Sequence, residues 1–269
     1  MIPKIIHYCW FSGDPYPEKV KKCIQSWKDN LPDYELRLWD MQCFDMNSIP
    51  FVKEAISVKK WAFAADYIRL YALYTEGGVY LDSDVWVNKS FGELLKYDFF
   101  TSVEYHPDCI RDNNTLNLLN DDGSSKEKGQ RKPGIGLQAA VLGSVPDHPY
   151  VKSALKWYEK NHFVLPDGSL NNVFIAPDVL AMVAEDYGFK YKNKKQVLSN
   201  NMLILPSNIF AGNLNYDVND DTVAMHLSLH SWNPPKRTPF YIRLINKAKK
   251  CLSIKLSKTN IAAGNGRNA

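Results

Sequence analysis

The first part of the chain alternates between continuous apolar runs and a stretch of helical spacing. Ile2–Phe11 is apolar almost throughout, which is typical of a strand buried on both faces. In Glu18–Lys28 the apolar residues recur every three to four positions, as in an amphipathic helix, and Leu36–Trp39 is a second apolar run. Strand, helix and strand at this spacing predict a parallel βαβ unit. Ligands bind outside the carboxyl ends of such strands, which places Trp10 near the crevice.

A buried helix, a sharp stop and a strand are predicted next. Apolar side chains cover nearly all faces of Trp61–Tyr74, so this helix is expected to be largely buried. Asp66 and Arg69 are the two charges inside it, and their spacing of three puts them on one face, within reach of each other. Gly77-Gly78 then supplies the positive-φ end of a helix. Val79–Val87 is rich in β-branched and aromatic residues, which predicts a strand.

Two carboxylates interrupt that apolar strand at Asp82 and Asp84. Side chains two apart on a strand point to the same face, so both carboxylates are expected to converge on one spot. Two like charges in an apolar setting need a cation between them, and oxygen ligands indicate Mg²⁺ or Mn²⁺. Such ions keep positions for phosphate oxygens, so the pair predicts a phosphate-bearing ligand. The alternative is a strand end that runs into a polar turn.

The second half of the chain carries three features that bear on a site. Glu104–Lys132 is polar and irregular, and a loop this long is either disordered or a functional lid; we favour a mobile loop over the acceptor side. Gly134–Val145 predicts a strand or strand-like segment. Thr222–Trp232 alternates cleanly between apolar and polar residues, so a strand is expected that holds His226 and His230 on one polar face.

Length and composition limit the class of protein. The 269 residues suit one α/β domain with an appendage, and we expect a domain over residues 1–235 and a tail over 236–269. A net charge of +4 is too small to indicate nucleic-acid binding. Five scattered cysteines without a CxxC spacing point away from zinc and indicate a reducing, cytoplasmic compartment. We expect neither a signal peptide nor a membrane span, since no apolar run reaches about 18 residues.

The tail has a different composition from the domain. Residues 236–258 hold eight basic residues and no acidic one, with apolar residues interleaved. A basic amphipathic helix is typical of a segment that lies on a membrane surface, where each basic residue contributes roughly 1 kcal/mol. A solvated helix packed back on the domain is the equal alternative. The first interpretation would make the protein peripheral on the inner face of the membrane.

The stretch AADYIRLYALYTEGGVYLDSDV resembles the signature of glycosyltransferase family 32, the DXD sugar transferases. That family includes bacterial capsular and lipopolysaccharide enzymes and yeast mannosyltransferases, and it is similar to the glucosyltransferase domains of large clostridial toxins. Ala65 stands where the family usually has Ser. The resemblance implies a GT-A-like single Rossmann-type domain with a mostly parallel central sheet, followed here by the basic helical tail. It also implies that Asp66 and Arg69 bind the donor sugar and serve catalysis.

The resemblance extends to residues outside the signature. Trp10 matches an aromatic residue that stacks on the nucleotide base in the toxin domains, although a core tryptophan is the alternative from the residues alone. Gln138 is the candidate for a polar residue that faces the donor sugar. The late pattern His-x-x-x-x-Ser-Trp of the family matches His226, Ser231 and Trp232.

These late residues have specific expected roles. His226 is the first candidate to complete the metal shell with Asp82 and Asp84, and His230 is the second, although the family commonly has Gly there. Trp232 would close over the diphosphate through its indole N–H, which can only donate.

The implied reaction is a metal-dependent sugar transfer with retention of anomeric configuration. The donor would be a nucleotide-diphosphate sugar, with a UDP-sugar as first candidate. The acceptor would be a saccharide or lipid-linked oligosaccharide in capsule or lipopolysaccharide assembly. Two alternatives stay open. One is a phosphoryl-transfer enzyme of the haloacid dehalogenase type, in which the first Asp is a nucleophile. The other is a non-catalytic sugar-binding module, which the aromatic residues would allow.

Overall fold

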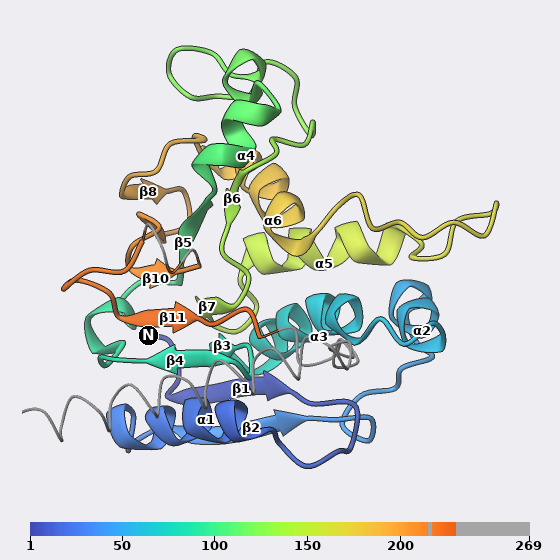
Figure 1. Ribbon diagram of the computed structural model, residues 1–269, viewed down its shortest axis with the longest axis vertical. Coiled ribbons are helices and arrows are strands. Elements are labelled where there is room, and N and C mark those ends of the chain that lie inside the picture. The colour runs from blue at the N-terminus through green and yellow to red at the C-terminus, as the bar shows by residue number, and fades with distance from the viewer. Residues whose placement is uncertain (213, 215–216, 230–269) are drawn as a thin grey trace, which may run out of the picture. The chain divides into compact units, whose positions relative to one another are not determined.

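The computed structural model describes residues 1–212, 214 and 217–229 (Figure 1). In chain order its helices and strands are β1 (Ile5–Cys9), α1 (Glu18–Asn30), β2 (Glu35–Trp39), α2 (Pro50–Ser57), α3 (Trp61–Glu76), β3 (Gly78–Leu81), β4 (Val85–Val87), β5 (Phe99–Tyr105), α4 (Pro107–Asp112), β6 (Ile135–Leu137), β7 (Val141–Ser144), α5 (Pro149–Lys160), α6 (Ala176–Ala184), β8 (Gln196–Leu198), β9 (Met202–Leu205), β10 (Phe210–Ala211) and β11 (Ala224–His226). Helices and strands intermix along the chain, and the predicted α/β class is confirmed.

The main sheet has the strand order β2-β1-β3-β7-β5-β9-β8, with β6 added beside β5. β1 runs parallel to β2 and β3, and β5 runs parallel to β9. β7 lies in the middle and runs antiparallel to both β3 and β5. The sheet is therefore mixed, and its parallel part is confined to the first strands and the β5–β9 pair.

The predicted βαβ unit at the start of the chain is confirmed. β1 and β2 pair in parallel from Ile5 opposite Glu35 to Cys9 opposite Trp39. The helix between them, α1, buries the apolar face that its spacing predicts, with Trp27 fully buried. This unit leaves Trp10 directly after the carboxyl end of β1.

Two hydrophobic cores lie on the two faces of the main sheet. One core joins the sheet to α2, α3, α5 and α6, and the other joins it to α1, β4, β10 and β11. Strand alternation decides which core each side chain enters: Phe99 of β5 belongs to the first core and Phe100 to the second. A second, three-stranded sheet of order β10-β11-β4 lies on the α1 side (Figure 1).

Side chains of α1 satisfy the free edge of β4. β4 pairs with β11 along one edge only. On its other edge, Trp27 Nε1 donates to the Val85 carbonyl at 2.7 Å, and the Ser26 hydroxyl accepts from the Val87 amide at 3.0 Å. Asn30 donates to the Val87 carbonyl at 3.0 Å. These bonds replace a strand partner, so the short β4 is fixed in position.

α3 is the predicted buried helix, and its end is as expected. Its residues from Ala64 to Leu70 are all buried. Gly77 and Gly78 follow with φ of +67° and +106°, so both occupy a region of backbone space that favours glycine. A Cβ on Gly78 would lie 2.7 Å from the Ile5 carbonyl oxygen, so glycine here also permits the close pairing of β3 with β1.

Three expected segments differ from the structure. Glu104–Lys132 is neither disordered nor a simple lid, because it contains the end of β5, α4 and the 3-10 helix Thr115–Leu118. Gly134–Val145 is two strands, β6 and β7, with a break between them. The strand expected over Thr222–Trp232 is only Ala224–His226 within the described residues, and Ser228 takes a positive φ of 47°, which ends the alternation.

The tail of residues 236–269 and the expected site residues His230 and Trp232 lie outside the described residues. Among the helices that the structure describes, none has the length and apolar character needed to cross a bilayer. The cysteines of the described part, Cys9, Cys23, Cys43 and Cys109, are unpaired.

Candidate active site

The sequence pattern predicted that Asp82 and Asp84 lie on one strand, but they lie in a turn between two strands. β3 ends at Leu81 and β4 begins at Val85, and the Val85 amide donates to the Asp82 carbonyl at 2.9 Å to close the turn. The strand breaks because the chain leaves the main sheet here and joins the second sheet. The carboxylates still converge, but a turn between two sheets brings them together and strand alternation does not.

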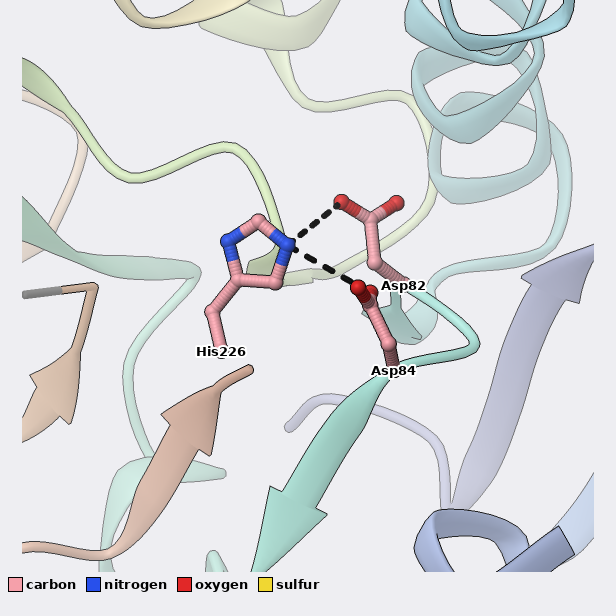
Figure 2. Close-up of side chains that lie close together, drawn as sticks. All are labelled: Asp82, Asp84 and His226. Carbon is pink, nitrogen blue, oxygen red and sulfur yellow. Dashed lines mark ion pairs between the residues drawn. The ribbon is translucent and has the colours of Figure 1, made fainter. Parts of the chain in front are cut away.

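His226 completes a cluster with these two carboxylates (Figure 2). β11 pairs antiparallel with β4, with His226 opposite Val85, so the pairing itself brings the imidazole to Asp84. Nε2 of His226 lies 3.3 Å from Asp84 Oδ1 and 3.9 Å from Asp82 Oδ2. One ligand atom from each of the three side chains lies within 4.8 Å of the others.

The cluster fits a divalent cation. Buried Nε2 of His226 has no aligned hydrogen-bond partner although it points at two carboxylates. Ligands around Mn²⁺ or Mg²⁺ at about 2.1 Å are separated by about 3 Å when adjacent, which is close to the spacing found here. Two oxygen atoms and one imidazole nitrogen would therefore hold the ion, and the remaining positions would be left for water and phosphate.

The backbone that follows β11 wraps around Asp84. The Leu227 amide donates to the Asp84 carbonyl at 3.1 Å, and the Leu229 amide donates to Asp84 Oδ2 at 2.7 Å. Asp84 is only 2% exposed, so these contacts fix which oxygen faces His226. Burial opposes ionisation, but interaction with His226 and the Leu229 amide outweighs it, and the pKa of Asp84 is lowered.

His226 shows the reciprocal effect. Burial alone would lower the pKa of its imidazole, but the neighbouring Asp84 and Asp82 carboxylates outweigh burial and raise it. The two carboxylates therefore favour the protonated form of the imidazole. A divalent ion would displace that proton, because an imidazole must be neutral to coordinate.

Arg69 and Asp66 form the adjoining part of the site, as their spacing on α3 predicts. Arg69 Nη2 lies 2.9 Å from Asp66 Oδ1 and 3.4 Å from Asp82 Oδ1, so the guanidinium links Asp66 on α3 to Asp82 in the turn. Burial raises the pKa of Asp66 to about 7 against the opposing charge of Arg69, and the charge of Asp82 adds to the rise. Both side chains are buried, with Asp66 at 8% and Arg69 at 4% exposure.

Two partners of this network were not among the predicted residues. Tyr80 donates its hydroxyl to Asp82 Oδ1 at 2.9 Å, and its ring lies 4.8 Å from the Arg69 guanidinium carbon. The Ala139 carbonyl accepts from Arg69 Nη1 at 2.7 Å. The place of Tyr80 two residues before Asp82 was the available sequence signal, whereas no side chain signals the Ala139 contact.

Gln138 occupies the break between β6 and β7, close to the centre. Its Oε1 accepts from the Ala140 amide at 3.0 Å, and the Ala140 carbonyl accepts from the Asp82 amide at 2.9 Å. Its Nε2 is buried and has no hydrogen-bond partner. A Cβ on Gly212 would lie 2.8 Å from that Nε2, so the glycine leaves the amide uncovered on this side.

Trp10 lies at the expected strand end, where its backbone amide donates to the Trp39 carbonyl at 3.0 Å. Its Nε1 donates to the Asp14 carbonyl at 2.8 Å, and its ring meets Tyr16 edge-on with centroids 5.0 Å apart. The ring is partly exposed and also packs against the core that contains α1, so base stacking and core packing both stay predictions for this residue. The structure thus brings Asp66, Arg69, Asp82, Asp84, Gln138 and His226 together, and leaves Trp10 on the adjoining strand end.

Comparison with known proteins agrees with this geometry. Residues 17–101 match the family model of the glycosyltransferase sugar-binding region containing the DXD motif. Inositol phosphoceramide mannosyltransferase 2 of Schizosaccharomyces pombe is 30% identical over 165 residues, which cover 60% of this chain and 39% of that protein. Inositol phosphoceramide mannosyltransferase 3 of the same yeast is 39% identical over 100 residues, which cover 36% of this chain and 28% of that protein.

The matched part of the chain thus spans less than two fifths of the length of these two relatives. Among solved structures, a glycosyltransferase described as PaToxG superposes with a TM-score of 0.48 at 20% identity, covering 69% of each chain. The resemblance to the DXD sugar transferases of family 32 is confirmed for the segment that carries α3 and the Asp82–Asp84 turn. The chain therefore contains the DXD-type sugar-binding region of a glycosyltransferase.

Proposed function

We propose that this protein is a metal-dependent glycosyltransferase of GT-A-like fold that moves a sugar from a nucleotide-diphosphate donor to an acceptor hydroxyl. The observation that carries the proposal is the convergence of Asp82, Asp84 and the unpartnered Nε2 of His226, next to the buried Asp66–Arg69 pair. A diphosphate leaving group needs its developing charge neutralised, and a cation held on these three residues supplies that stabilisation.

The ligand set favours Mn²⁺ over Mg²⁺. Mg²⁺ prefers an all-oxygen shell, whereas a site with one imidazole nitrogen and two carboxylates suits Mn²⁺ better. His226 is the described histidine in this position, so the ligand role does not need His230. His230 and Trp232 are kept as candidates that belong to the part of the chain outside the described residues.

Each residue around the metal centre has a proposed contact with a different part of the substrates. Asp66 accepts hydrogen bonds from sugar hydroxyls, and Arg69 holds Asp66 and neutralises Asp82. Gln138 offers its free amide to the sugar or to the acceptor. Trp10 stacks on the base at the end of β1, which its partly exposed ring allows.

Transfer with retention is part of the proposal. The resemblance to family 32 implies retention, and no carboxylate of the described residues is singled out as a nucleophile, so the proposed attack of the acceptor hydroxyl comes from the side on which the diphosphate leaves. A UDP-sugar is the first candidate donor. The names of the yeast relatives describe transfer of mannose to inositol phosphoceramide, so a mannose donor and a glycolipid acceptor are tested beside it.

The proposed setting is a biosynthetic one. Assembly of capsule or lipopolysaccharide on a lipid-linked acceptor, in the cytoplasm or at the inner face of the membrane, follows from the resemblance and from the basic composition of residues 236–258. Attachment through that tail would bring the site to a lipid-linked acceptor.

A donor assay tests the proposal directly. Purified protein is incubated with UDP-glucose, UDP-galactose or GDP-mannose, with Mn²⁺ or with a chelator, and released nucleotide and sugar are followed by NMR. We expect Mn²⁺-dependent turnover of one donor, and the released sugar should first appear as the α-anomer. Asp84→Asn should lose this turnover. Hydrolysis of p-nitrophenyl phosphate without any donor turnover would instead support a phosphoryl-transfer enzyme and overturn the proposal.

A further inference from the structure

Some of the buried polar atoms without a hydrogen-bond partner belong to the metal cluster and to Gln138 beside it. In the described part of the chain, four buried side-chain polar atoms have no hydrogen-bond partner: Tyr34 Oη, Ser102 Oγ, Gln138 Nε2 and His226 Nε2. The backbone amide of Gln138 donates to the Ser102 backbone carbonyl at 2.8 Å, so two of these four atoms belong to neighbouring residues. Buried polar groups without partners are rare in folded proteins and indicate a missing ligand or water.

The strand β5 carries this polar surface outward from the metal centre. Phe100 enters the core on the side of the second sheet, where its ring lies 5.9 Å from that of Phe210 in β10. Side chains two apart on a strand share a face, so Ser102 and Glu104 follow Phe100 on that side. Ser102 and Glu104 therefore face the side on which β10 and β11 lie, and His226 is on β11.

Glu104 pairs with His106 at the end of β5. Nε2 of His106 lies 3.0 Å from Glu104 Oε1, and the side chains are 19% and 40% exposed for Glu104 and His106. The side chain of His106, which precedes α4, makes no capping hydrogen bond to the helix, so capping does not explain the pair. Glu104 lies opposite Gly136 of β6, two residues before Gln138, so the β5–β6 pairing connects this pair to the break that holds Gln138.

We propose that Ser102, Glu104 and His106 form the acceptor subsite of this enzyme, built for the hydroxyl groups of a neutral saccharide. The proposal rests on the proposed glycosyltransferase function. A carboxylate that stays partly exposed accepts hydrogen bonds from hydroxyl groups, and the Ser102 hydroxyl can donate or accept. Gln138, whose amide nitrogen is unpartnered, lies between this surface and the metal turn, where donor and acceptor must meet.

The charge of the surface selects the class of acceptor. The carboxylate of Glu104 would repel an anionic group of the acceptor, so an acceptor with a carboxylate or phosphate near its reacting hydroxyl is disfavoured. A neutral hexoside instead offers several hydroxyl donors to Glu104 and Ser102.

Saturation-transfer NMR with defined probes tests the subsite. Wild-type protein with Mn²⁺ and UDP, or with Mn²⁺ and GDP, is mixed with the methyl glycosides of glucose, galactose and mannose. We expect saturation transfer from the protein to one of these neutral glycosides. Ser102→Ala and Glu104→Gln should weaken its binding by roughly tenfold or more, as expected for loss of a hydrogen bond to a charged group, and should leave nucleotide affinity within about twofold.

A stability readout separates this role from a structural one. Removing an unpartnered buried hydroxyl lifts a penalty, so Ser102→Ala should unfold at the same or a higher temperature than wild type while it binds glycoside less well. A structural hydroxyl would give the opposite, with lower stability and unchanged binding. Glu93→Gln, which alters an exposed carboxylate paired with Lys96, is the matched control for Glu104→Gln.

The outcomes distinguish the two proposals. The subsite is wrong and the transferase proposal stands if wild type binds a nucleotide with Mn²⁺ but shows no saturation transfer to any glycoside. The same conclusion follows if both variants bind the glycoside as well as wild type does. If wild type binds no nucleotide with or without Mn²⁺, the proposed function fails and the subsite fails with it. Glycoside binding that needs no nucleotide would also overturn the subsite and favour a sugar-binding module.

Discussion

Arg69 is the buried cation that pairs with two carboxylates of the site, Asp66 and Asp82. Its Nη2 serves Asp66 and Asp82, its Nε donates to the Ala65 carbonyl at 3.2 Å, and its Nη1 donates to the Ala139 carbonyl at 2.7 Å. A planar fork of donors is needed to reach these partners at once, and lysine does not have it. One buried cation thus makes two buried or half-buried carboxylates tolerable.

Replacing Arg69 by methionine should destabilise the protein by about 3–5 kcal/mol, because it leaves Asp66 and Asp82 uncompensated. Arg37→Met is the control, since Arg37 pairs with Glu35 and Glu76 in a more exposed setting and should cost less than about 1 kcal/mol. Urea unfolding of both variants measures the difference. Equal losses in the two variants would contradict the central place given to Arg69.

Asp66 should give the stability of the metal-free protein a pH dependence. Its pKa is raised from 3.8 to about 7 in the folded state, so between these values the folded protein holds a proton that the unfolded chain has released. The free energy of unfolding therefore falls as pH rises through this window, by an amount on the order of 1.4 kcal/mol per unit of pKa difference at most.

Urea unfolding at about pH 5 and about pH 7.5, in the presence of a chelator, measures this effect in wild type and in Asp66→Asn. The variant carries no titrating group at this position, so its loss of stability between the two pH values should be smaller than that of wild type. Identical losses would show that Arg69 keeps Asp66 ionised throughout.

At the scale of elements, the site depends on a strand that breaks. The β-branched and aromatic residues of Val79–Val87 predict a single strand, whose geometry would put both carboxylates on one face. The structure places Asp82 and Asp84 in the turn where the chain leaves the main sheet for the second one. The alternation of apolar residues does not show this, because both β3 and β4 are buried and equally apolar.

The sequence was informative where local chemistry decides the structure. The helix with Asp66 and Arg69, its glycine end and the first βαβ unit follow from spacing alone. The two-sheet arrangement, the antiparallel β7 and the Ala139 carbonyl contact depend on long-range pairing that no local pattern records. His226 was found only through a strand pattern and a family resemblance, and the observed strand is much shorter than that pattern predicts.

Gly78 offers a test of the junction between α3 and β3. Alanine here would combine a φ of +106° with a Cβ 2.7 Å from the Ile5 carbonyl oxygen, so we expect a loss of about 3 kcal/mol or more. Gly188 has a similar φ of +96°, but a Cβ added there would meet no atom within 4 Å, so alanine should cost only about 1 kcal/mol. Thermal unfolding compares the two, and equal losses would mean that backbone strain alone matters.

At the scale of the whole molecule, the site joins parts that lie far apart in the chain. Asp66 and Arg69 come from a helix in one core, whereas Asp84 lies in the turn that leads into β4 and His226 ends β11, both strands of the other sheet. The helix α1 holds the free edge of β4, so even the first βαβ unit contributes to the position of Asp84. Binding of a cation should therefore stabilise the described domain as a unit.

The most direct test of the central claim is calorimetric titration with UDP, GDP and CDP, each with and without Mn²⁺. Wild type is compared with Asp84→Asn and with Asp178→Asn. The second variant changes a buried carboxylate of α6 that is paired with Arg131. We predict that one diphosphate binds wild type and Asp178→Asn in the presence of Mn²⁺. Its affinity should fall about tenfold or more without Mn²⁺ and in Asp84→Asn. Binding that is indifferent to Mn²⁺ and to Asp84, or no binding of any diphosphate, would contradict the account.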